Sequence, residues 1–163
     1  MPLFPSYPPC ASRLHDLLAR AELSHDAVAQ CIGLNADWVR DLQAFDHELY
    51  SNVSLAQLQR LAYLLNTDAS TLLLAPPLPK DVVHLTFEQL VQKVREHLRS
   101  SNTGIEAFGE SVGWDVSSAL SNPHACWEWC PDEVVDVAGA LGIPWQSVLP
   151  PQALVPPPVP HGV

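Results

Sequence analysis

The residues best suited to metal chemistry lie in the short stretch HACWEWC, residues 124–130. Imidazole and thiolate groups are ligands that zinc prefers, and His124, Cys126 and Cys130 provide both kinds. A second pair at a usable distance is absent from the sequence, because Cys10 and Cys31 lie far upstream. We therefore expect neither a metal site nor a cofactor, and we interpret the thiols as buried or half-buried groups on a loop.

Catalytic chemistry finds no support in the remaining reactive residues. The sequence has no nucleophile elbow, no phosphate-binding glycine loop and no HExxH motif. His15 and Asp16, like Asp46 and His47, are neighbours in sequence, which does not make either pair a catalytic dyad. The carboxylates are spread along amphipathic helices and read as solvated faces, so we expect a protein that is not an enzyme.

The amino-acid composition limits the kinds of partner that this protein could bind. The chain has 163 residues, of which 47% are hydrophobic, so it can bury a core. Its 8 basic and 18 acidic residues give a net charge of −10, which argues against non-specific adhesion to nucleic acid or anionic membranes. No apolar run reaches the length of a membrane span, and the start, MPLFPSYPPC, does not resemble a signal peptide. We expect a cytoplasmic protein with reduced cysteines.

Proline-rich segments divide the chain. Residues 1–10 contain four prolines and are predicted to form an extended arm. Residues 150–163 contain six prolines and no charge, and are predicted to be a disordered or polyproline tail. Residues 75–84, which begin with APPLPKD, are predicted to be a semi-rigid linker. The segments between them, 11–74 and 85–149, have helical periodicity.

Capping residues mark the helices of the first block. Ser24 is the predicted N-cap for HDAVAQCI, and Gly33 is predicted to end that helix in a left-handed conformation. Asn35 then begins a helix that runs to about residue 43, and Ser54 caps another. With a first helix after residue 11 and a short last one at DASTLLL, the block contains five predicted helices.

The second block repeats this plan. GIEAFGESVGW parallels SHDAVAQCIGL, with Gly113 standing 80 residues after Gly33. Ala138 and Leu141 stand 76 residues after Ala62 and Leu65. Two similar five-helix units indicate an internal duplication, which rests on the pattern alone.

The segments LSHDAVAQCIGLNADWVRDL and SLAQLQRLAYLLNTDASTLL resemble the Cro/lambda-repressor-like (XRE-type) helix-turn-helix family. The likeness covers most of residues 11–74 and, more faintly, 85–149. Its register is carried by Leu23, Ser24, Val28, Ala29, Gly33, Leu34, Asn35 and Val39, followed by Leu58, Leu61, Ala62, Leu65 and Leu72.

The resemblance implies an all-α protein of two tandem five-helix helix-turn-helix units, the second divergent, with residues 35–43 as the recognition helix. It implies that Ser24 and His25 lie near DNA phosphates, where backbone amides and the helix dipole favour anions. The residues it directs toward the bases are Asn35, Ala36, Asp37, Trp38 and Arg40.

Several positions depart from the family pattern. Asp41 stands where Arg or Lys is common, and Gln43 replaces the usual glutamate near the end of the recognition helix. The arginine that commonly pairs with that glutamate falls at Leu18, and Phe45 replaces a glycine. These departures are compatible with the fold and argue against contact with DNA.

The distribution of basic and acidic residues is compatible with two functions, DNA binding and protein binding. Residues 11–74 contain four basic and eight acidic residues, and only Arg40 is on the recognition helix. Residues 100–163 contain seven acids and neither Lys nor Arg. The first hypothesis is a regulator that binds DNA through the first unit, as a homodimer, with the second unit dimerising or recruiting a partner. The alternative is an acidic protein-interaction module, antitoxin-like or DNA-mimic-like, that has lost DNA binding.

Tryptophans are the other candidate binding residues. Trp127 and Trp129 are predicted to lie at a protein interface, where this residue type is enriched. Trp114 and Trp145 occupy positions that are apolar in the family, so we expect them to pack in the core. Trp38 lies on the face that would meet a ligand, and both interface contact and local packing stay open for it.

Overall fold

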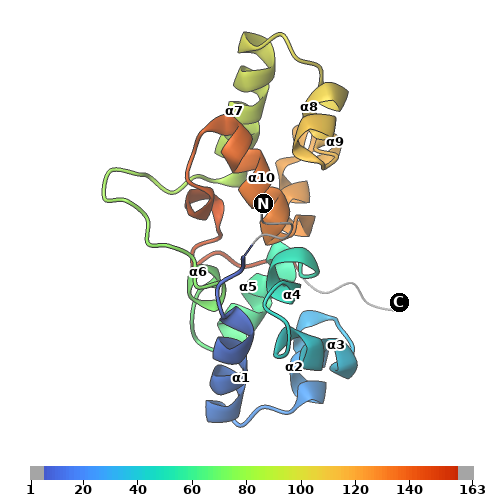
Figure 1. The fold of residues 1–163 in the computed structure, drawn as a ribbon, viewed down its shortest axis with the longest axis vertical. Coiled ribbons are helices and arrows are strands. Elements are labelled where there is room, and N and C mark those ends of the chain that lie inside the picture. The colour runs from blue at the N-terminus through green and yellow to red at the C-terminus, as the bar shows by residue number, and fades with distance from the viewer. Residues whose placement is uncertain (1–5, 158–163) are drawn as a thin grey trace.

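The computed structural model describes residues 6–157, and regular structure within this range is helical, with no strand (Figure 1). The predicted all-α class is therefore confirmed. None of the described helices is both long and apolar enough to cross a membrane. The α-helices are α1 (Cys10–Arg20), α2 (His25–Ile32), α3 (Ala36–Leu42), α4 (Glu48–Ser51), α5 (Leu55–Leu64), α6 (Ala69–Leu72), α7 (Phe87–Ser100), α8 (Ile105–Val112), α9 (Ser117–Ser121) and α10 (Pro131–Leu141). The 3-10 helices are η1 (Pro123–Glu128) and η2 (Trp145–Val148).

The predicted caps begin the helices of the first half. The Ser24 hydroxyl accepts the Ala27 amide at 3.1 Å, and the Asn35 side chain accepts the Trp38 amide at 2.8 Å. Ser54 forms a capping box with Gln57 at the start of α5. Gly33 ends α2 with a φ of 75°, a left-handed conformation that glycine adopts without steric cost.

The second half of the chain uses some of the same helix-capping residues and differs at other positions. Gly113 ends α8 with a φ of 81°, and Pro131 occupies the first turn of α10. The stretch 124–130 is predicted as a loop, and its first five residues belong to η1 instead. Pro123 favours this start because it lacks the amide hydrogen that the first turn of a helix leaves unpaired.

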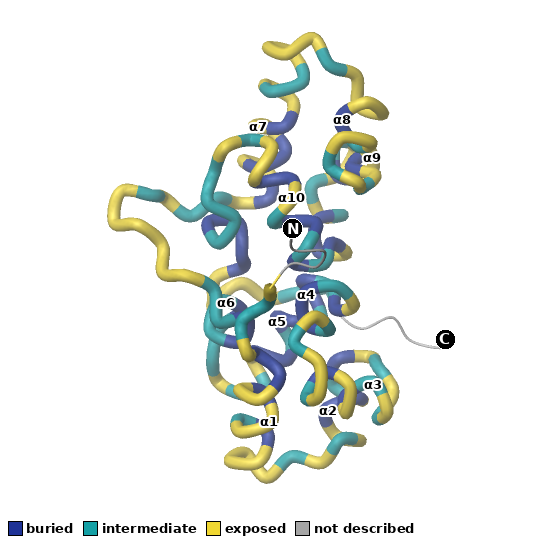
Figure 2. The backbone as a smooth tube through the Cα atoms, in the orientation of Figure 1, coloured by how far each residue is buried: buried dark blue, intermediate teal, exposed yellow. Residues whose placement is uncertain are grey.

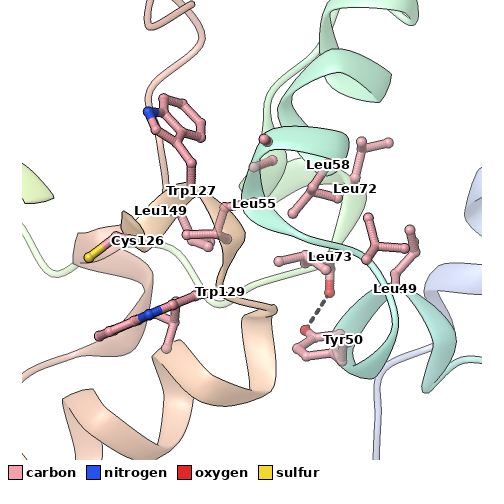
Figure 3. Close-up of a cluster of buried hydrophobic side chains, with 14 of the residues drawn as sticks. Leu49, Tyr50, Leu55, Leu58, Leu72, Leu73, Cys126, Trp127, Trp129 and Leu149 are labelled. Carbon is pink, nitrogen blue, oxygen red and sulfur yellow. Dashed lines mark hydrogen bonds between the residues drawn. The ribbon is translucent and has the colours of Figure 1, made fainter. Parts of the chain in front are cut away.

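One hydrophobic core runs through both halves of the chain (Figure 2). α5 packs against η1, and α4 packs against α10. Figure 3 shows Trp127 and Trp129 of the η1 segment, which comprises residues 123–129, near Leu55 of α5. The Leu55 amide donates to the Trp129 carbonyl at 2.8 Å, so the start of α5 is completed by the other half of the chain.

The contacts of α5 with η1 and of α4 with α10 form the junction of the two halves. A network of polar and aromatic side chains also connects the halves at this junction. Asp132 of α10 accepts hydrogen bonds from the Tyr7 hydroxyl at 3.0 Å and the Ser51 hydroxyl at 2.6 Å. The ring of Tyr50 lies 5.0 Å from that of Tyr7 and 6.0 Å from that of Trp145. The Tyr50 hydroxyl donates to the Leu73 carbonyl at 2.7 Å.

The N-terminal arm is shorter than the predicted 1–10. Cys10 is buried as the first residue of α1, where its thiol donates to the Asp46 carbonyl at 3.1 Å. Tyr7 packs on the junction described above. Proline is tolerated immediately before a helix, so Pro9 does not prevent α1 from starting at Cys10. Residues 1–5 lie outside the described range.

The prediction of a disordered or polyproline tail is wrong for its first part. The Gln59 amide, fully buried on α5, donates to the Pro151 carbonyl at 2.7 Å and the Leu154 carbonyl at 2.8 Å. These bonds hold the backbone of residues 151–154 against α5. Residues 158–163 lie outside the described range. The linker, by contrast, forms a loop that projects from the body in Figure 1, and the Leu85 amide at its end donates to the Ser147 carbonyl at 2.9 Å.

Glu133 is a buried carboxyl group on α10, close to the junction. Only 8% of its surface is exposed, and burial, aided by the negative charge of Asp115, raises its pKa to about 7. An unfolded glutamate titrates near pH 4. Between these two pKa values, Glu133 is protonated in the folded state and ionised in the unfolded state. The free energy of unfolding therefore falls as the pH rises through this range.

Truncating Trp129 tests the shared core. Trp129→Ala should lower the free energy of unfolding by about 3 to 5 kcal/mol, because it removes a large buried side chain. Urea unfolding followed by circular dichroism measures the loss. Trp38→Ala, which truncates a half-buried tryptophan away from the junction, should cost less. A loss below about 1 kcal/mol for Trp129→Ala would mean that the junction does not depend on this side chain.

Replacing Glu133 tests the buried carboxyl. Glu133→Gln should raise the free energy of unfolding by up to about 3 kcal/mol at pH 8, where the wild type must bury a charge. At pH 5, where the wild-type carboxyl is already protonated in the folded state, the gain should be much smaller. Urea unfolding at both pH values checks this, with the exposed Glu96→Gln as a control. An equal effect at pH 5 and pH 8 would contradict the raised pKa.

Candidate functional site on two exposed helix pairs

The α2–α3 pair contains the residues predicted to meet DNA. Ser24 and Asn35 are exposed, but their side-chain oxygens are engaged as the N-caps of α2 and α3. Ala36 is half-buried in the first turn of α3. The capping bonds hold the two helices in place and leave fewer free acceptors or donors for a ligand.

Arg40 and Asp37 pair with each other on α3. The Arg40 guanidinium donates to the Asp37 carboxylate at 2.9 Å, and these side chains are 65% and 87% exposed. Asp41 is also exposed on this short helix. The one cation of the predicted recognition helix is thus neutralised by its neighbour, which leaves the face acidic through Asp41.

Trp38 packs locally. It is half-buried, and its indole nitrogen donates to the Glu48 carboxylate at 3.3 Å. The bond from Trp38 to Glu48 ties α3 to α4, and Glu48 also accepts the side-chain amide of Asn52 at 2.7 Å. Of the two roles left open for Trp38, the geometry favours packing between these helices.

Gln43 connects three helices. Its side-chain nitrogen lies 3.1 Å from Nε2 of His25 and donates to the Val39 carbonyl at 3.0 Å. Its side-chain oxygen lies 3.1 Å from Nδ1 of His15 on α1. The contact between the end of α3 and α1 is therefore made with His15, whereas Leu18, at the position of the family's arginine, is buried in the core. His25 is engaged by this network and half-buried.

The α8–α9 pair forms an open groove of about 500 Å³. Ile105, 43% exposed, and Trp114 provide apolar surface, and Glu106, Glu110 and Asp115 provide carboxylates. Neither Lys nor Arg lines the groove. The Ser117 hydroxyl, 2.6 Å from Asp115, holds the pKa of that carboxyl below its usual value, so Asp115 stays ionised.

Gly109 allows α8 to lie close to the turn at Trp114, beside this groove. A Cβ atom at that position would lie 2.8 Å from the backbone oxygen of Trp114, so only glycine allows α8 to approach the turn so closely. Trp114 was expected in the core but is half-buried, because it lies over the groove and donates to the Asp136 carboxylate at 2.8 Å.

A basic surface begins on the other side of Ile105. Arg95 and Arg99 of α7 line a second groove there, and the Arg95 guanidinium donates to the Leu120 carbonyl. Ile105 lines both grooves. The end of the molecule formed by α7, α8 and α9 therefore has an acidic side and a basic side that meet at one exposed apolar residue.

The predicted interface role of Trp127 and Trp129 is wrong for an external partner. The two side chains are 4% and 5% exposed, and η1 packs on α5 and α7. Their large apolar surface is used inside the chain, at the junction of its two halves. Trp145, expected in the core, is half-buried against Tyr50.

The thiols of the HACWEWC stretch are poorly suited to ligation. Burial raises the pKa of Cys126 to about 12, and burial also raises that of Cys130, so both stay protonated at neutral pH. Among residues 6–157, no group of three or more His, Cys, Asp or Glu side chains is placed to hold a metal ion.

The contacts on the α2–α3 pair predict an order of stability effects. Asp37→Asn should change the free energy of unfolding by less than about 1 kcal/mol, because its ion pair is exposed. Gln43→Ala should cost about 1 to 2 kcal/mol, because it removes contacts among α1, α2 and α3. Urea unfolding of both variants measures the difference. Equal losses would show that Gln43 does not connect the helices.

The chain matches no protein-family model, no curated protein and no solved structure. The resemblance to the Cro/lambda-repressor-like family therefore stays a prediction that rests on the residues quoted for it.

Proposed function

We propose that this protein is a non-enzymatic, cytoplasmic regulator made of two tandem helix-turn-helix units, and that it binds a basic protein surface rather than DNA. In this proposal α1–α6 form one unit and α7–η2 form the other. The acidic groove on the α8–α9 pair is the principal binding site, and the acidic face of α3 is a second one.

The contacts between the halves support the tandem arrangement. If η1 is the counterpart of α4, and α10 that of α5, then the packing of α5 on η1 and of α4 on α10 is reciprocal. Such reciprocity is the property of a two-fold symmetric dimer. Pro131 aligns with Leu55 and has no amide hydrogen, so only the Leu55 half of the symmetric hydrogen-bond pair is made. The proposed units thus pair within one chain, in place of the homodimer expected from sequence.

The α8–α9 groove carries the functional proposal. Its three carboxylates have no lysine or arginine partner within the described residues, where the ion pairs found are Arg40–Asp37 and His47–Glu48. Unpaired charges around an apolar centre fit a partner of opposite charge that inserts an apolar side chain. The fitting partner is a segment that carries Arg or Lys beside Leu, Ile or an aromatic residue.

DNA binding through α3 is the second candidate. The observation that favours it is the exposure of α3 and of Arg40, whose ion pair with Asp37 is solvated. An exposed pair contributes little free energy, so Arg40 can exchange Asp37 for a base or phosphate at small cost. Asp37 and Asp41 would still face the DNA, and this is why we place DNA second.

A matched pair of double variants tests the proposed partner class. The probe is a fluorescent amphipathic peptide with Arg on one face and Leu on the other, followed by anisotropy at low and moderate salt. We expect saturable binding that weakens with salt, and a loss of at least about tenfold when Glu106→Gln and Glu110→Gln are combined. The control combines Glu22→Gln and Glu96→Gln, which removes the same charge from exposed sites elsewhere.

Two outcomes would contradict the proposal. Equal losses in the two double variants would mean that the peptide responds to net charge and not to the groove. Saturable, salt-sensitive binding of labelled duplex DNA that Arg40→Ala weakens would favour the DNA candidate instead.

A further inference from the structure

A small, partly open cavity lies where three segments distant in sequence meet. Its volume is about 180 Å³, and it lies among the end of the linker, η1 and the start of the tail. Phe87, Trp127, Val148 and the half-exposed Leu154 provide apolar walls. The titratable residues that line it are His84, Glu88 and His124. It is separate from the α8–α9 groove, with which it shares no lining residue.

The walls of this Trp127 cavity are held by contacts that do not involve a ligand. The rings of Phe87 and Trp127 meet edge to face, with centroids 5.1 Å apart. The buried Gln59 amide fixes the backbone around Leu154, and the bond from Leu85 to Ser147 fixes the linker against η2. Preformed walls reduce the ordering cost that a ligand would have to offset.

The size and chemistry of the cavity indicate the class of ligand. An apolar cavity of about 150 Å³ stays dry and binds benzene, so a cavity of the present size accepts a molecule with one or two small rings. Burial lowers the pKa of His84, which is neutral at physiological pH, while Glu88 is exposed. Glu88 and the net charge of −10 disfavour an anionic ligand. We propose that the Trp127 cavity binds a small uncharged aromatic compound.

Binding there would join the linker, η1 and the tail through one molecule. Because the ligand binds only the folded arrangement of these segments, it should stabilise the protein in proportion to its concentration. This proposal is independent of the basic partner, since the groove and the cavity lie on different elements.

Nuclear magnetic resonance with indole as the probe tests the cavity. Titration of indole into the ¹⁵N-labelled full chain should give saturable shifts centred on Phe87, Trp127 and Leu154. The same ring with a negative charge, indole-3-carboxylate, should bind at least about tenfold more weakly, because Glu88 is at the cavity. Leu154→Trp should weaken indole binding at least about tenfold by occupying the cavity. Val155→Trp, a matched change at the next exposed residue, should leave it within about twofold.

Three results would overturn the proposal. The first is the absence of saturable shifts at millimolar indole in the wild type, which needs no variant to fold. The second is a set of shifts centred on residues that do not line the cavity. The third is equal indole affinity in Leu154→Trp and Val155→Trp, with unchanged α1–α3 resonances showing that both variants are folded.

Discussion

The packing of the η1 segment against α5 is the contact on which the rest of the structure depends. The first amides of a helix have no partner within the helix. In α5, Ser54 satisfies the Gln57 amide, and the Trp129 carbonyl satisfies that of Leu55. Trp127 and Trp129 are buried at the same junction (Figure 3). One half of the chain therefore completes a helix of the other half and covers its apolar face, and this joins the two into a single core.

This junction determines which surfaces stay free. α4, α5, η1 and α10 face one another, whereas the α2–α3 and α8–α9 pairs lie toward opposite ends of the long axis (Figure 1). The net charge of −10 has little compensation on these two pairs. On α3 the single arginine is paired with Asp37, and the charged side chains that line the α8–α9 groove are all carboxylates. The acidic faces of these two pairs are better suited to a basic protein surface than to a phosphate backbone.

Local features of the sequence predicted the helices well, and long-range contacts account for the errors. Ser24, Asn35, Ser54 and Gly33 act on backbone groups a few residues away, so their roles follow from spacing. The burial of Trp127 and Trp129 depends on α5, about seventy residues earlier. The backbone of residues 151–154 is held by Gln59 across 92 and 95 positions. Sequence periodicity does not report such contacts. The spacing of Cys126, Trp127 and Trp129 before Pro131 is the signal in the sequence for a buried turn, and it agrees with the expected burial of the thiols but not with an interface role for the tryptophans. On the candidate site, the exposure of α3 followed from sequence, whereas the pairing of Arg40 with Asp37 and the α8–α9 groove required the structure.

Native-state hydrogen exchange tests most directly whether the two halves form one cooperative unit. The slowest amides of α5 and of α10 should exchange with the same free energy and the same dependence on denaturant, because opening either helix breaks the junction. The Leu55 amide, bonded to Trp129, should belong to this slowest group. Exchange of α10 through a separate opening of lower free energy, with α5 still protected, would show that the halves are independent units and would contradict the account.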